Sequence, residues 1–121
     1  MPKIQLSPQQ LRALASLTKG EGIYRQESAL QPIGRAHLVQ RWMSARQRCM
    51  DAIGAVRDIE RAPFKGVVAD PYAPTPPVDQ AALALAQQAL DAAMADEAAA
   101  WGRIQRMVDR ARALMADQWL R

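Results

Sequence analysis

The segment 37–48 carries the polar side chains of this sequence that are best suited to contact phosphates or base edges. Four of them recur at intervals of four, three and four residues and a glutamine borders them; the set is His37, Gln40, Arg41, Ser44 and Arg48. On a helix this spacing places them along one side. Arginine pairs with phosphate through its planar fork, and glutamine can pair with base edges. This polar stripe therefore predicts a nucleic-acid contact, while a simply solvated helix face remains the alternative.

Arg46 differs from its neighbours because helical periodicity places it on the apolar side of the same segment, between Trp42 and Cys49. A buried guanidinium without a partner is very costly. Glu97, at an inward-facing position of the last predicted helix, has the complementary charge. The sequence therefore predicts a buried ion pair between Arg46 and Glu97, with a binding interface for Arg46 as the alternative. Cys49 is expected to be a packed thiol.

Catalytic and metal-binding patterns are missing from the sequence. The sequence has one cysteine and one histidine, which excludes a disulfide framework and a multi-cysteine zinc site. With a single residue of each type, a Cys–His nucleophilic pair is also not expected. No Gly-rich phosphate loop and no Ser/His/Asp set at helical spacing is present. We therefore expect a protein that is not an enzyme and that needs no cofactor and no metal. Uncharged runs shorter than the roughly 18 residues of a membrane span, and a start without an apolar stretch, predict a cytoplasmic protein.

Charge is distributed unevenly along the 121 residues. Residues 1–61 carry a formal charge of +5, residues 79–100 carry −4 and residues 101–121 carry +3, for a total of +4. The basic first half predicts a nucleic-acid-binding accessory or regulatory protein of bacterial or phage origin. Two alternatives remain open: a protein-only adaptor or inhibitor that binds an acidic partner surface, and an oligomeric structural or DNA-packaging component.

Helical periodicity and helix boundary signals organise most of the chain. Ser7, Pro8 and Gln10 form a capping box that begins the first helix. Asp79 or the Thr75-Pro76 pair can cap the last one. The predicted helices are 8–19, 22–30, 35–61 and 78–119, separated late in the chain by the connector 62–78.

These elements predict an all-α fold. The expected architecture is a small bundle in a single domain, 1–121, with two short N-terminal helices, a long central helix, a Pro-rich crossover and a long C-terminal helix. The crossover holds five of the eight prolines and cannot be helical. Phe64 and Tyr72 are expected to pin it to the helices.

The last helix predicts self-association. Eleven positions spaced alternately by four and three, eight of them apolar, form a coiled-coil-like seam that runs from Leu83 to Gln118 and is interrupted by polar residues. An antiparallel homodimer would set its acidic first half against its basic second half, with Met94, Trp101 and Ile104 as anchors. The alternative is a monomer in which the helix breaks near Gly102 and folds back on residues 35–61.

Overall fold

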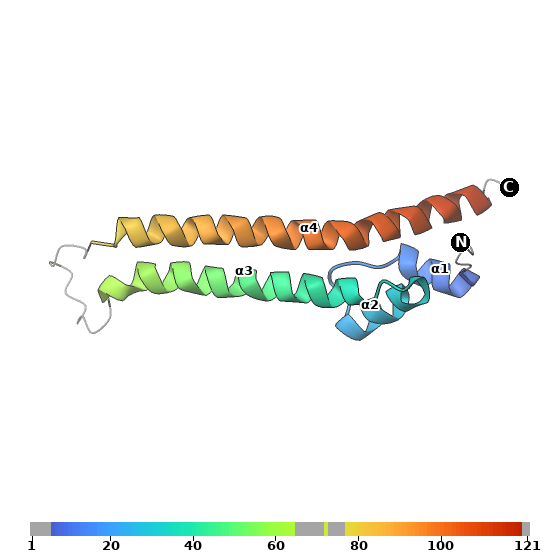
Figure 1. Ribbon diagram of the computed structural model, residues 1–121, viewed down its shortest axis with the longest axis horizontal. Helices are drawn as coiled ribbons and strands as arrows, with labels where there is room; N and C mark the ends of the chain where they lie inside the picture. Colours follow the sequence, from blue (N-terminus) through green and yellow to red (C-terminus); the bar gives the residue numbers. More distant parts are fainter. Residues whose placement is uncertain (1–5, 65–71, 73–76, 120–121) are drawn as a thin grey trace. The chain divides into compact units, whose positions relative to one another are not determined.

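The computed structural model describes residues 6–64, 72 and 77–119, and all its regular elements within them are helices (Figure 1). This confirms the predicted all-α bundle. The α-helices are α1 (Pro8–Ala15), α2 (Ile23–Leu30), α3 (His37–Arg61) and α4 (Gln80–Trp119). Two single 3-10 turns, η1 (Gln31–Ile33) and η2 (Ala62–Phe64), follow α2 and α3.

The helix starts agree with the capping signals in the sequence. Ser7 Oγ accepts a hydrogen bond from the Gln10 backbone N–H at 3.1 Å, and Gln10 Oε1 accepts one from the Ser7 N–H at 2.9 Å. Asp79 Oδ1 accepts from the Ala82 N–H at 3.0 Å, so Asp79 caps α4. The end of α1 differs from the prediction, because Ser16 leaves the helical conformation and the helix stops at Ala15 instead of residue 19.

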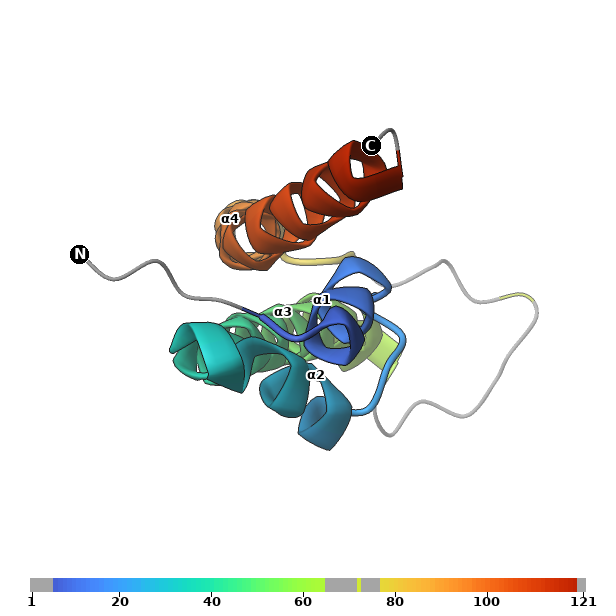
Figure 2. The same ribbon diagram turned by 90° about the vertical axis from the view of Figure 1, so that its right-hand side faces the viewer.

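The chain forms two compact units, one built from both ends of the sequence and one from its continuous middle. The terminal unit consists of residues 1–44 and 98–121, and the middle unit of residues 45–97. Each unit therefore contains one part of α3 and one part of α4. In the terminal unit α1 lies between α2 and α4 (Figure 2).

The core of the terminal unit is made of large side chains. Trp42 of α3 and Trp101 of α4 pack together with ring centroids 5.0 Å apart and ring planes tilted by 59°. The other large buried apolar residues of this cluster come from all four helices and the loop after α1: Leu11, Leu14, Leu17, Leu30, Leu38, Val39, Ile104 and Val108. Burial of this area is the main stabilising contribution to the unit.

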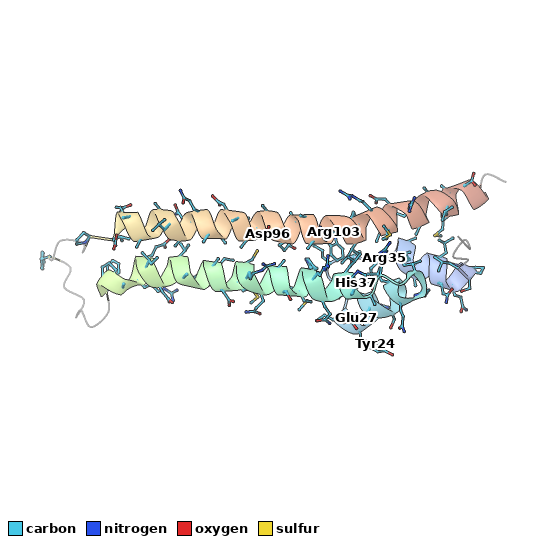
Figure 3. All side chains as sticks on the ribbon, in the orientation of Figure 1. Tyr24, Glu27, Arg35, His37, Asp96 and Arg103 are labelled. Atoms are coloured by element: carbon cyan, nitrogen blue, oxygen red, sulfur yellow. The ribbon has the colours of Figure 1, made fainter. Side chains whose placement is uncertain are left out.

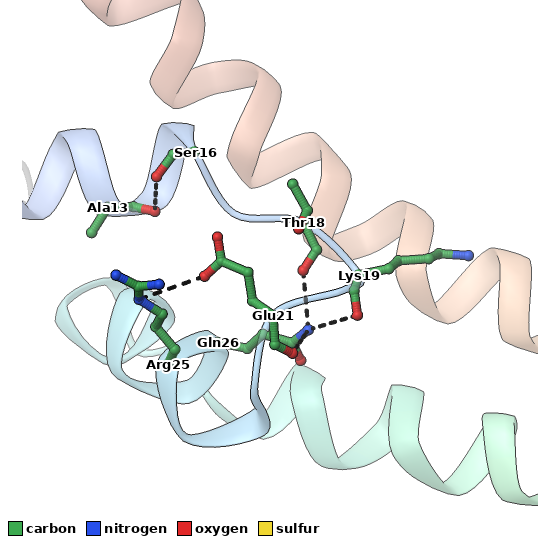
Figure 4. A network of polar contacts seen from close by, with 7 residues as sticks. All are labelled: Ala13, Ser16, Thr18, Lys19, Glu21, Arg25 and Gln26. Carbon is green, nitrogen blue, oxygen red and sulfur yellow. Dashed lines mark hydrogen bonds and ion pairs between the residues drawn. The ribbon is translucent and has the colours of Figure 1, made fainter.

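One buried amide organises the loop between α1 and α2 (Figure 4). Gln26 is fully buried, and its Nε2 donates to the backbone carbonyls of Thr18 at 3.2 Å, Lys19 at 3.4 Å and Glu21 at 3.1 Å. A donor shared among carbonyls of a partly buried loop stabilises the conformation that brings them together. Gln26 therefore holds the loop in the conformation that places Leu17 in the core.

Small side chains form the interior of the middle unit. Its buried apolar residues are Ala45, Val56 and Ala93. Phe64 is 51% exposed and Tyr72 is 94% exposed, so neither ring is buried. Tyr72 does have an interaction partner, and the pinning of the crossover by these two residues stays a prediction. Thr75 and Pro76 lie outside the described residues.

Candidate functional site

The predicted polar stripe is solvent-exposed along α3, but acidic neighbours accompany it. His37, Gln40, Arg41, Ser44 and Arg48 are all exposed. Gln40 Nε2 donates to the Glu27 carboxylate of α2 at 2.6 Å; Figure 3 labels Glu27 and, at the start of α3, His37. A glutamine held by a carboxylate is less available for a base edge. The contact of this stripe with nucleic acid stays a prediction.

The prediction of a buried Arg46–Glu97 pair is wrong with respect to burial. Arg46 is exposed and Glu97 is half-buried. In the middle unit the inward-facing strip of α3 is centred on Ala45 and Val56, and Arg46 lies one position to its side. Both charged side chains have interaction partners, and their mutual pairing stays a prediction. Cys49 is a free, half-buried thiol.

Two of the three predicted dimer anchors are used inside the chain. Trp101 and Ile104 are buried in the core of the terminal unit, so they are not available to a second copy. The helix also runs unbroken through Gly102, which excludes the predicted alternative of a break there. Met94 is 55% exposed, because Ala93 takes the inward-facing position beside it.

Folding gathers the basic residues in the terminal unit. This unit contains eleven Lys or Arg and four Asp or Glu, a formal charge of +7, whereas the middle unit contains five and eight, a charge of −3. The nine basic side chains described in the terminal unit are all exposed: Arg12, Lys19, Arg25, Arg35, Arg41, Arg103, Arg106, Arg110 and Arg112. The basic segment 101–121 and the basic N-terminal segment belong to the same folded unit. The order of charges along the sequence did not predict this.

Three of these arginines follow one side of α4. Arg103, Arg106 and Arg110 are spaced by three and four residues, which places them on a common face turned away from Ile104 and Val108. None of the three forms an ion pair with another residue that the structure describes. We name them the arginine face. Arg112, on the opposite side, instead donates from Nε to the Ala15 carbonyl at 2.8 Å and so ties α4 to the end of α1.

An apolar groove lies beside the arginine face. It has a volume of about 560 Å³ and is lined by residues of α1, of the turn after α2 and of α4: Leu6, Leu11, Leu14, Ile33, Arg35, Met107, Arg110, Ala111 and Leu114. Its two polar groups are the exposed guanidiniums of Arg35 and Arg110. The sequence does not predict this groove, because its walls come from segments that lie far apart in the chain. The one local signal is Leu114, an apolar residue outside the seam.

Metal-binding groups, membrane-spanning helices and related proteins were each looked for. Within 6–64, 72 and 77–119, no three His, Cys, Asp or Glu side chains are grouped so that they could hold a metal ion. None of the helices in these ranges combines the length and apolarity needed to cross a membrane. No family model matches the chain, and the comparisons with curated proteins and with solved structures gave no significant match. The chemistry of the two units is therefore the basis for inferring what the protein does.

Proposed function

We propose that this chain is a non-enzymatic nucleic-acid-binding accessory or regulatory protein that contacts phosphates through its terminal unit. The observation that supports the proposal is the gathering of charge: the fold places eleven of the sixteen basic residues in a unit of charge +7. The described basic side chains of that unit are exposed. A surface of this kind attracts a polyanion over a distance of about the Debye length, roughly 8 Å at physiological salt.

The arginine face is the part of this surface that suits a phosphate backbone best. Arg103 and Arg106 lie on neighbouring turns of one rigid helix, so their guanidiniums can contact successive phosphates without ordering a loop. Arg41 adds a further cation from α3 in the same unit. Contacts to phosphates give affinity and orientation but little sequence specificity. We therefore propose binding that is largely independent of base sequence.

The experiment compares two variants that remove the same charge from the two units. Arg103→Ala with Arg106→Ala changes the terminal unit, and Arg57→Ala with Arg61→Ala changes the middle unit. Binding of labelled duplex DNA and of single-stranded RNA is measured by fluorescence anisotropy over a salt series. The first variant should bind more weakly and lower the slope of log K against log salt by about two, since each lost phosphate contact removes about 0.9.

Two results would contradict this proposal. One is the absence of binding to either nucleic acid at low salt, which would favour the protein-only adaptor that uses the same cations on an acidic surface. The other is an equal loss in both variants, which would show that only total charge matters. Arg41→Ala with Arg48→Ala in the same assay tests the polar stripe: unchanged affinity and slope would remove it from the binding surface.

A further inference from the structure

The apolar groove of the terminal unit is poorly suited to nucleic acid. Seven of its nine lining residues are apolar, whereas a phosphate backbone has no bulky apolar group to fill it. Arg35 and Arg110 add two exposed cations to the apolar lining. A groove of this composition suits an apolar side chain that has a carboxylate close by. It therefore points to a second interaction, distinct from the proposed phosphate contacts.

The groove is built on well-defined turns. Gly34 adopts a left-handed conformation with φ of 69°, and its N–H bonds to the Gln31 carbonyl at 2.9 Å. The next N–H, of Arg35, bonds to the Leu30 carbonyl at 3.1 Å. This arrangement is typical of a helix end closed by glycine. It orients Ile33 and Arg35 toward the groove, so little ordering is needed when a partner binds.

We propose that the groove binds the middle unit of a second copy of this chain, with Met94 inserted into the groove and Asp91 facing Arg35 or Arg110. The middle unit has the opposite net charge, −3 against +7. Met94 is 55% exposed, and Asp91, one turn earlier on α4, is exposed on the same side. The flexible methionine side chain adapts to irregular apolar space.

The choice of Met94 follows from its acidic neighbour. Leu85 is more exposed, at 68%, but the residues three and four positions away from it are alanines and a glutamine. Met94, unlike Leu85, has a carboxylate at helical spacing, that of Asp91 three residues earlier. The pairing also replaces the dimer that the sequence predicted, because it uses neither Trp101 nor Ile104, which the core has buried.

This contact joins two different surfaces, so it is heterologous. Each copy keeps a free groove or a free Met94 face after one contact forms, and further copies can add until a ring closes. A single inserted side chain with one charge contact indicates a small interface, and small interfaces are weak. We therefore expect reversible assembly that increases with protein concentration and decreases at high salt.

The experiment is sedimentation velocity of the full chain and of three surface variants. Leu114→Arg blocks the groove; Leu114 is 54% exposed, so the fold tolerates the change. It also makes the terminal unit more positive, so a loss of assembly cannot result from weaker long-range attraction. Met94→Gln removes the inserted side chain without changing charge, and Leu85→Gln is the matched control on the same helix. We expect the first two to weaken association by about tenfold or more and the control to assemble normally.

Mixing gives the decisive result. Leu114→Arg has an intact Met94 face and Met94→Gln has an intact groove, so the mixture should form a heterodimer and nothing larger. A wild-type chain that is monomeric at all concentrations, or a Leu85→Gln variant as defective as Met94→Gln, would overturn the proposal. So would two defective variants that do not complement each other. Neither result depends on Arg103 or Arg106, so failure here is distinguishable from failure of nucleic-acid binding.

Discussion

The terminal and middle units contain parts of the same two helices but are built differently. In α4 the inward-facing positions continue at intervals of three and four through both units. In the terminal unit they carry the buried Trp101, Ile104 and Val108, whereas in the middle unit Leu83, Ala86 and Leu90 are only half-buried and Ala93 is the buried one. Alanine is the best helix former but buries little apolar area. The difference shows that a regular helix and a well-packed core are separate properties of a sequence.

The two units differ in net charge as well as in the size of their buried side chains. The well-packed terminal unit is basic, and the alanine-rich middle unit is acidic. The exposed large apolar side chains of the middle unit include Met50, Met94 and Leu85. One unit therefore has the larger core and the phosphate-binding chemistry, while the other has acidic groups next to exposed apolar side chains.

The largest effect is expected from removing a tryptophan of the terminal core. Trp101→Ala deletes the ring that packs on Trp42 and the indole N–H that donates to Gln105 Oε1 at 3.3 Å. The cavity and the lost burial should lower the free energy of unfolding by about 3 to 5 kcal/mol. Urea unfolding followed by circular dichroism measures the change.

The matched control for that measurement is Met94→Ala in the middle unit. Met94 is more than half exposed, so its removal should change stability by at most about 1 kcal/mol. Equal losses for the two variants would contradict the difference in packing between the units.

A smaller loss is expected from the buried amide of the terminal unit. Gln26→Leu keeps the side chain similar in size but removes the donor to the carbonyls of Thr18, Lys19 and Glu21. The Lys19 and Glu21 carbonyls lose this donor, while the Thr18 carbonyl keeps the Glu21 N–H at 3.3 Å, so stability should fall by about 1 to 2 kcal/mol. Thermal unfolding of this variant is compared with that of Gln40→Leu, in which an exposed amide is lost. If the two melting temperatures agree with that of the wild type, Gln26 does not hold the loop.

The smallest effect is expected at Arg46 in the middle unit. A buried ion pair would make Arg46→Ala costly by about 3 kcal/mol or more. Because Arg46 is exposed, we expect a loss of at most about 1 kcal/mol, whatever its partner is. Chemical denaturation at low and high salt measures it, and a large loss that salt does not reduce would show that the middle unit packs more tightly than its alanines suggest.

The helices themselves could be read from local signals. The Ser7 capping box, the Asp79 cap and the prolines of the crossover act within a few residues, so they place helix ends without knowledge of the fold. The end of α1 was less predictable, because Gln26 stabilises the loop from eight residues away from Thr18. Side-chain burial was predicted correctly for Trp42 but not for Arg46, since periodicity gives an angle around a helix and not the width of the contact.

Local signals along the chain were enough to predict the helices, their approximate bounds and the all-α class, and they contain no familiar catalytic pattern. These properties depend on backbone conformation, capping and side-chain chemistry within one or two turns. Three other properties became visible in the folded chain: its basic end joins its basic start, Trp101 and Ile104 are core residues, and Leu114 lines a groove with Leu6 and Ile33. The physical reason is that charge summation and apolar burial act through space, between residues that the order of the chain keeps far apart.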